Sequence, residues 1–215
     1  IWIRLWLWLW LWLWLWRKPW ILRRKHTRGE KRNFKLLEKK MKFEKTALEG
    51  VFILIPKVFG DDRGYFFEPF NKKEFTANVG DFNFVQDNQS KSSKGVLRGL
   101  HFQNPPFEQG KLIRVIKGSV SDVIVDIRKS SKTYGKHLKV TLTESNFKML
   151  WIPPGFAHGF ETLEDNTIFA YKVTNYYNKE SEGCILWNDP NLEIKWESEH
   201  PLVSDKDKTK GNKNK

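Results

Sequence analysis

The stretch "KLIRVIKGSVSDVIVDIR", residues 111–128, decides the fold class of this 215-residue chain. β-Branched and aliphatic residues dominate it, which is typical of β-strands. Gly118 predicts a tight connection between two strands. In the second strand Val120, Asp122 and Ile124 share one face, because side chains alternate along a strand. The stretch therefore predicts two consecutive strands.

The same enrichment continues outward along the chain, in segments bounded by Gly, Pro, Asn or Ser. The further predicted strands are 50–56, 64–70, 95–106, 137–144, 147–153 and 166–177. A short helix is predicted over 71–80, with Asn71 as its N-cap. Many short strands with few helices predict an all-β fold, a sandwich or barrel. The spacing favours a double-sheet jelly roll with one or two short helices.

The net charge of +13 is concentrated in the first forty residues, which hold 12 Lys or Arg and 2 Asp or Glu. Residues 41–215 carry a net charge of only +3. A nucleic-acid partner is therefore disfavoured, since the rest of the chain is close to neutral.

Residues 1–40 open on "IWIRLWLWLWLWLWLWRKPW", in which Leu and Trp alternate. The apolar run Leu5–Trp16 is shorter than the roughly 20 residues of a membrane-spanning helix. The flanking charge follows this run, unlike in a signal peptide. A membrane-surface anchor stays open, but we favour a translated repetitive tract that is not part of the fold. We expect the folded domain to span 41–208 and 209–215 to be a disordered polar tail.

The chain holds one cysteine, Cys184, so an intrachain disulfide is excluded. Without a secretion signal, the expected location is the cytoplasm.

His101 lies in the predicted strand "GVLRGLHFQNPP", residues 95–106. A jelly-roll metal site usually offers two histidines one residue apart, but position 103 is Gln103. His158 alone would complete the site poorly, so we predict no metal. A lone strand histidine is more often a core or surface residue than a catalytic base, which needs an orienting acceptor.

Two further segments carry candidate groups whose roles stay open. "WIPPGFAHGFETL", residues 151–163, is a rigid loop that either positions His158 for binding or forms a structural turn. Tyr171 shares a strand face with Phe169, so it is either a core residue or a proton donor facing a cavity. If basic and amide groups converged, they would suit an anionic ligand such as a diphosphate. These groups are Arg63, Gln86, Asn88, Arg98 and Lys111.

Several blocks in register give the chain a family resemblance. They are "GDDRGYFFEPFN", "FVQDNQSKSSKGVLRGLHFQ", residues 111–128, "WIPPGFAHGFETL", "YKVTNYYNKESEGCILWNDPNLEIKW" and "LVSDKD". Together they resemble the dTDP-4-dehydrorhamnose 3,5-epimerase family over about 41–208. The resemblance implies a homodimeric, cupin-type jelly roll. It also implies the substrate dTDP-4-dehydro-6-deoxy-D-glucose and a reaction without metal or organic cofactor.

The resemblance also implies site residues. His101 falls on the catalytic base, Asp207 on its orienting carboxylate, Tyr171 on the proton donor and Lys111 on the cation beside the oxyanion. The implied substrate contacts are Arg63, Glu68, Gln86, Asn88, Arg98, His158, Glu182 and Lys206. Two departures are Gln89, where the family commonly has His, and a C-terminal stretch without the usual proline-rich ending.

The implied reaction removes a proton beside the C4 ketone and returns it from the opposite ring face, at C3 and at C5. The alternatives are an epimerase acting at one carbon, a ketoisomerase on a related sugar, and a non-catalytic sugar-binding cupin. In a flat strand Arg98 and His101 would point to opposite faces. We therefore predict a bulge at Gly99 that turns both side chains toward one cavity.

Overall fold

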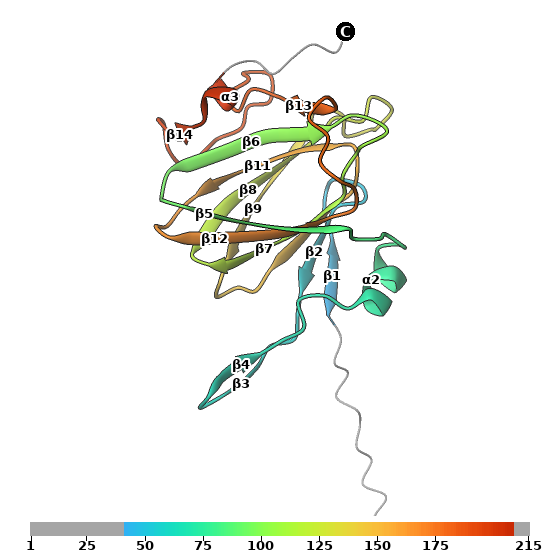
Figure 1. Ribbon diagram of the computed structural model, residues 1–215, viewed down its shortest axis with the longest axis vertical. Coiled ribbons are helices and arrows are strands. Elements are labelled where there is room, and N and C mark those ends of the chain that lie inside the picture. Colours follow the sequence, from blue (N-terminus) through green and yellow to red (C-terminus); the bar gives the residue numbers. More distant parts are fainter. Residues whose placement is uncertain (1–40, 209–215) are drawn as a thin grey trace, which may run out of the picture. The chain divides into compact units, whose positions relative to one another are not determined.

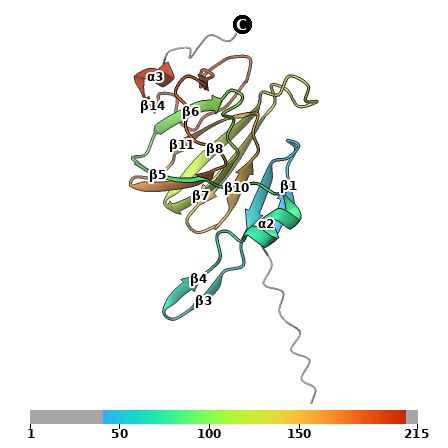
Figure 2. The ribbon, with the colours of Figure 1, turned by 45° about the vertical axis from the view of Figure 1, so that its right-hand side comes forward.

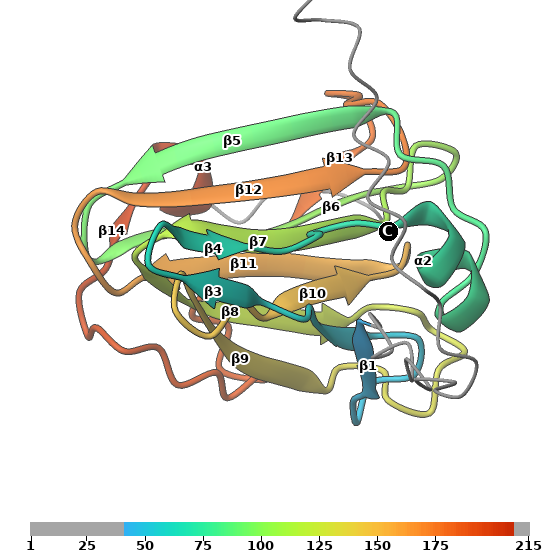
Figure 3. The same ribbon diagram turned by 90° about the horizontal axis from the view of Figure 1, so that it is seen from below.

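The computed structural model describes residues 41–208, so the predictions for 1–40 and 209–215 lie outside the described residues. Two antiparallel sheets face each other (Figure 1), as the predicted double-sheet jelly roll requires. The first sheet, seen from below in Figure 3, runs in the order β1 (Lys42–Lys45), β2 (Phe52–Ile55), β10 (Met149–Ile152), β7 (Lys111–Lys117), β12 (Thr167–Val173) and β5 (Gln86–Ser92).

The second sheet contains most of the remaining strands. Its order is β13 (Glu182–Cys184), β6 (Val96–Gln103), β11 (Phe156–Thr162), β8 (Ser119–Asp126) and β9 (His137–Thr143), with β14 (Leu202–Val203) parallel to β6. The connection at Gly118 is as tight as predicted, but it links β7 of one sheet to β8 of the other. It therefore closes one end of the sandwich.

The core fills the space between the sheets, and β8 shows how the sequence builds it. Val120 and Ile124 point inward and pack with buried side chains of both sheets. Val123 and Val125 point to the outer face, where a C-terminal segment covers them. The predicted alternation is thus confirmed, although both faces of β8 are buried.

The short helix α2 (Lys72–Asn78) covers one end of the first sheet. The Asn71 side chain accepts a hydrogen bond from the Glu74 amide at 3.3 Å, which confirms the predicted N-cap. Phe75 is buried against Trp151 in an edge-to-face contact, with 5.1 Å between ring centroids.

The C-terminal segment crosses the outer face of the second sheet and ends in α3 (Asp205–Lys208) beside β6 (Figure 2). Trp196 Nε1 donates to the Trp187 carbonyl at 2.8 Å, and the Glu197 amide donates to the buried Glu161 carboxylate at 2.7 Å. These contacts fasten the segment that carries α3.

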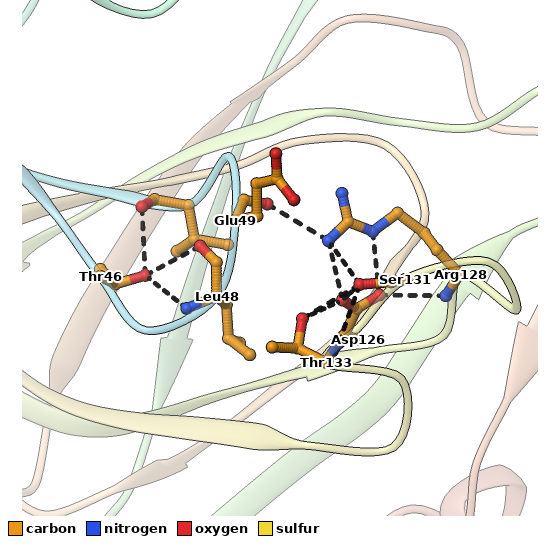
Figure 4. A network of polar contacts seen from close by, with 8 residues as sticks. Thr46, Leu48, Glu49, Asp126, Arg128, Ser131 and Thr133 are labelled. Carbon is orange, nitrogen blue, oxygen red and sulfur yellow. Dashed lines mark hydrogen bonds and ion pairs between the residues drawn. The ribbon is translucent and has the colours of Figure 1, made fainter.

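The loop from β8 to β9 is held by a buried carboxylate (Figure 4). Asp126 is fully buried and accepts hydrogen bonds from Arg128, Ser131 and Thr133. Burial alone would raise the pKa of Asp126, but these hydrogen bonds hold it well below its ordinary value. Arg128 also donates to the Glu49 carbonyl at 3.2 Å, which ties the loop to the N-terminal turn.

A hairpin formed by β3 (Phe59–Asp61) and β4 (Gly64–Phe66) projects away from both sheets (Figures 1 and 2). We call residues 59–66 the arm. It exposes Tyr65 and Phe66 at 62% and 66% of their surface. The predicted strand over 64–70 is thus only three residues long. Within residues 41–208, no helix is long and apolar enough to cross a bilayer.

Candidate active site

A pocket of about 460 Å³ is walled by strands of both sheets and by α3. It gathers eight of the predicted site residues, which are Asn88, Arg98, His101, Lys111, His158, Tyr171, Lys206 and Asp207. Gln89, Ser90, Phe160, Phe169 and Ser204 complete the lining. One cavity therefore holds all four residues that were predicted to be catalytic.

The predicted bulge in β6 is confirmed. In the pairing of β6 with β11, Arg98 lies opposite Phe160 and His101 lies opposite His158. Two residues of β6 therefore face a single residue of β11 between these pairs, which defines a bulge. Gly99 has a φ of +125°, and a Cβ there would lie 2.5 Å from the Gly159 Cα atom. Only glycine fits this conformation and this close approach. The bulge brings Arg98 and His101 to the same pocket.

His101 and Asp207 form a dyad across 106 residues of sequence, with 2.5 Å between His101 Nε2 and Asp207 Oδ1. Asp207 is 2% exposed, and its own amide donates to the Ser204 carbonyl at 3.0 Å. Burial alone would raise the pKa of Asp207, but the hydrogen bond and charge of His101 hold it below its ordinary value. The carboxylate is therefore ionised and can fix the imidazole ring.

A second pair lies deeper in the pocket and joins β11 to β8. His158 Nε2 is 3.0 Å and 3.1 Å from the two carboxylate oxygens of Asp122, which is fully buried. Burial lowers the pKa of His158, although Asp122 opposes the shift. Asp122 was not among the predicted site residues. The signal was present, because the alternation placed an acid on the same strand face as Val120 and Ile124.

Lys111 on β7 and Tyr171 on β12 come from the first sheet. Burial lowers the pKa of Lys111 to about 8, while the charges of Asp122 and Glu182 partly oppose this shift. Burial raises the pKa of Tyr171, so its phenol stays protonated at neutral pH. The pocket thus offers a cation close to titration and a neutral hydroxyl donor.

Two predicted contacts lie next to the pocket rather than in its lining. Gln86 donates to the Asn88 side chain at 2.7 Å. Glu182 pairs with Lys206 and accepts a hydrogen bond from the Tyr177 hydroxyl at 3.0 Å. Both therefore support side chains that line the pocket.

Two other predicted contacts lie outside the pocket of their own chain. Arg63 is on the arm, where its side chain is 89% exposed and pairs with Asp61 at 2.5 Å. Glu68 lines a separate cavity of about 200 Å³ together with Phe59 and Phe66. Neither residue reaches the dyad in this structure.

Gln103, which was predicted to replace a metal-binding histidine, has a structural role. Its side-chain amide donates to the Phe107 and Tyr176 carbonyls, and its oxygen accepts from the Asn178 amide. In residues 41–208, one group of His, Cys and Asp side chains converges enough to hold a metal ion. This group is His101, Cys184 and Asp207.

Comparisons with known proteins identify the family of this chain. A family model described as dTDP-4-dehydrorhamnose 3,5-epimerase matches residues 45–213. A relative of that name from Shigella flexneri is 56% identical over 164 residues, which are 76% of this chain and 91% of the relative.

Two solved structures have the same fold. A 3,5-epimerase from Legionella pneumophila in complex with dTDP-4-keto-L-rhamnose is 46% identical, with a TM-score of 0.75 over 78% of this chain and 90% of that one. A 3'-monoepimerase from Streptomyces bikiniensis in complex with dTDP-quinovose is 30% identical, with a TM-score of 0.73 over 76% and 84% of the two chains.

Proposed function

We propose a function from one premise: this chain belongs to the dTDP-4-dehydrorhamnose 3,5-epimerase family. The enzyme inverts C3 and C5 of dTDP-4-dehydro-6-deoxy-D-glucose and releases dTDP-4-dehydro-L-rhamnose. One observation carries the proposal. The His101–Asp207 dyad lies on β6 and α3, and Tyr171 lines the same pocket from β12 of the facing sheet (Figure 1).

The chemistry follows from the C4 ketone. C3 and C5 both flank it, so removal of either proton gives an enolate with its negative charge on the C4 oxygen. His101 takes the proton, and the ionised Asp207 holds the ring and stabilises the imidazolium. No electrons are transferred to or from the sugar, so these steps need no redox cofactor.

Lys111 stabilises the enolate oxygen as it develops. A preorganised group of this kind is typically worth about 3–4 kcal/mol of barrier. Tyr171 then donates its proton to the carbon from the ring face opposite His101. A base and an acid on opposite faces convert proton exchange into inversion, which is why Tyr171 is essential to this proposal.

The remaining polar groups bind the nucleotide sugar. Arg98 is exposed at the pocket, where its guanidinium donates to Ser92 Oγ at 3.1 Å and is available for a diphosphate. Lys206 adds a second cation, and Asn88 and His158 add hydrogen-bonding groups. This set suits an anionic, hydroxyl-rich ligand.

We propose that the enzyme is a homodimer. Arg63 and Glu68 match substrate contacts of the family, yet they lie outside the pocket of their own chain. An arm that exposes Tyr65 and Phe66 fits a contact with a second copy. The free Cys184 is compatible with a reducing cytoplasm as the place of action.

A second candidate function is inversion at one carbon only, because a 3'-monoepimerase shares the fold. Proton NMR with dTDP-4-dehydro-6-deoxy-D-glucose in heavy water separates the two. We expect deuterium to enter both C3 and C5, and a His101→Ala control to give neither. Exchange at one carbon would support the monoepimerase. A folded protein without any exchange would leave a sugar-binding function.

A further inference from the structure

Cys184 lies beside the dyad, although neither the proposed reaction nor substrate binding uses it. It pairs directly with His101 in the antiparallel register of β13 and β6. Directly opposed side chains lie on the same sheet face, with Cβ atoms about 5 Å apart. Cys184 Sγ is 4.0 Å from Asp207 Oδ1. The backbone thus holds a thiol, an imidazole and a carboxylate together.

The ligand atoms of these three side chains lie within 4.8 Å of one another. Tetrahedral Zn²⁺ with bonds of about 2.0 Å to N and O and 2.3 Å to S sets neighbouring ligand atoms about 3.3–3.5 Å apart. The His101–Asp207 separation of 2.5 Å would have to open by about 0.8 Å. The Cys184–Asp207 separation of 4.0 Å would have to close by about 0.5 Å. Both shifts are within the reach of side-chain rotation.

The chemistry of the donors favours a borderline-soft metal. A thiolate, an imidazole and a carboxylate are all ligands of Zn²⁺, whereas Mg²⁺ and Ca²⁺ prefer oxygen ligands alone. The site is reachable, because His101 and Asp207 line the pocket and the His101 side chain is 30% exposed. The pocket also leaves room for water as a fourth ligand.

We propose that His101, Cys184 and Asp207 form an inhibitory Zn²⁺ site in the proposed active site. On binding, the Cys184 S–H bond breaks, its proton passes to solvent and a Zn–S bond forms, without any change of oxidation state. Zn²⁺ binds Nε2 of His101, the nitrogen that faces Asp207, and separates the two side chains. The neutral ring then carries its proton on Nδ1, so neither nitrogen can accept another proton. Enzyme with bound Zn²⁺ has therefore lost its base. The binding site stands on geometry alone, while the inhibition rests on the proposed function.

The test uses the full chain, stripped of metal with a chelator. Zn²⁺ is titrated into the heavy-water exchange assay with the wild type, Cys184→Ala and Cys184→Ser. We expect Zn²⁺ to stop exchange by the wild type, and excess chelator to restore it. Both variants should keep basal exchange and need at least about tenfold more Zn²⁺ for the same inhibition. Mg²⁺ is the control metal and should not inhibit.

Co²⁺ provides a readout that does not depend on activity. Binding to the wild type should produce the near-ultraviolet absorption of a cobalt–thiolate bond, and Cys184→Ala should lack it. Thermal melting of both variants verifies that they fold.

Equal inhibition of the wild type and Cys184→Ala by Zn²⁺, or no cobalt–thiolate absorption, would overturn the site. Cobalt–thiolate absorption without inhibition by Zn²⁺ would refute the proposed inhibitory effect and count against His101 as the base. An enzyme without any exchange activity would refute the proposed function, while the cobalt spectrum still decides the metal site.

Discussion

Lys111 lies in the pocket wall, where burial brings its pKa to about 8. An ammonium there can stabilise an enolate, while the neutral amine cannot. We therefore expect the exchange rate to fall as the pH rises through about 8. Lys111→Gln should remove this alkaline limb and lower the rate by about 10²–10³-fold. Initial rates of deuterium exchange between pH 6 and pH 10 measure both effects.

Asp122 provides the control for this prediction. Its charge raises the pKa of Lys111 against the effect of burial. Asp122→Asn should therefore lower the Lys111 pKa and move the alkaline limb to lower pH. A limb that stays in place, or moves to higher pH, would show that another group is responsible.

At the scale of single residues, the sequence alone left His101 ambiguous. Its acceptor Asp207 is 106 positions away, and no local pattern connects them. The family resemblance identified both residues, and the structure brings them together in one pocket. Asp122 was missed because the resemblance supplied no role for it, although its place on an inward strand face was visible.

At the scale of elements, the bulge in β6 could be predicted because the family resemblance assigns Arg98 and His101 to one site, although their odd separation would turn them to opposite faces of a flat strand, and Gly99 lies between them. Gly99→Ala should destabilise the fold by about 3 kcal/mol or more, because a positive φ and an overpacked Cβ each cost about 1–3 kcal/mol. If the substitution removed the bulge, Arg98 and His101 would point to opposite faces of the strand. We therefore expect exchange activity to fall by more than the loss of folded protein accounts for. Denaturant unfolding and the exchange assay measure the two losses.

Gly135→Ala is the matched control for Gly99→Ala. Gly135 also has a positive φ, of +74°, but a Cβ there meets no atom within 4 Å. Gly135→Ala should lower the free energy of unfolding by about 1–2 kcal/mol and leave the exchange rate unchanged. Equal effects of the two substitutions would mean that the close contact between β6 and β11 is not what makes Gly99 necessary.

Other features of the strands could not be predicted from the sequence, for physical reasons. β5 (Gln86–Ser92) is an edge strand whose seven residues are all polar, so neither hydrophobic alternation nor β-branched residues mark it. The burial of both faces of β8 depends on a C-terminal segment far along the chain. A strand is thus readable locally only where apolar or β-branched residues mark it, and the neighbours of a strand are not readable locally.

At the scale of the whole molecule, we propose that the folded domain begins near residue 41. The strands nearest this boundary support the proposal, because β1 pairs with β2, which pairs with β10 of the first sheet. Charge also divides here, since residues 41–215 are close to neutral while residues 1–40 are strongly basic. The pocket, the arm and the C-terminal segment all lie after this boundary.

The arm gives the proposed homodimer a stringent test, because Arg63 lies outside the pocket of its own chain. If Arg63 serves the partner's pocket, His101→Ala and Arg63→Ala chains should complement each other. Each mixed dimer then has one site with an intact His101 that receives an intact arm. After unfolding and refolding an equal mixture, we expect about a quarter of the wild-type exchange rate, since about half of the dimers are mixed.

Each variant refolded alone is the control, and both should be far less active than the mixture. If Arg63 serves its own pocket, or no pocket, the mixed dimer gains no intact site. The mixture would then have only the mean rate of the two variants. Sedimentation of the same samples verifies the dimer, and a monomeric wild type with full activity would exclude any contribution from a second arm. A rate above that mean therefore requires an active site built from two chains.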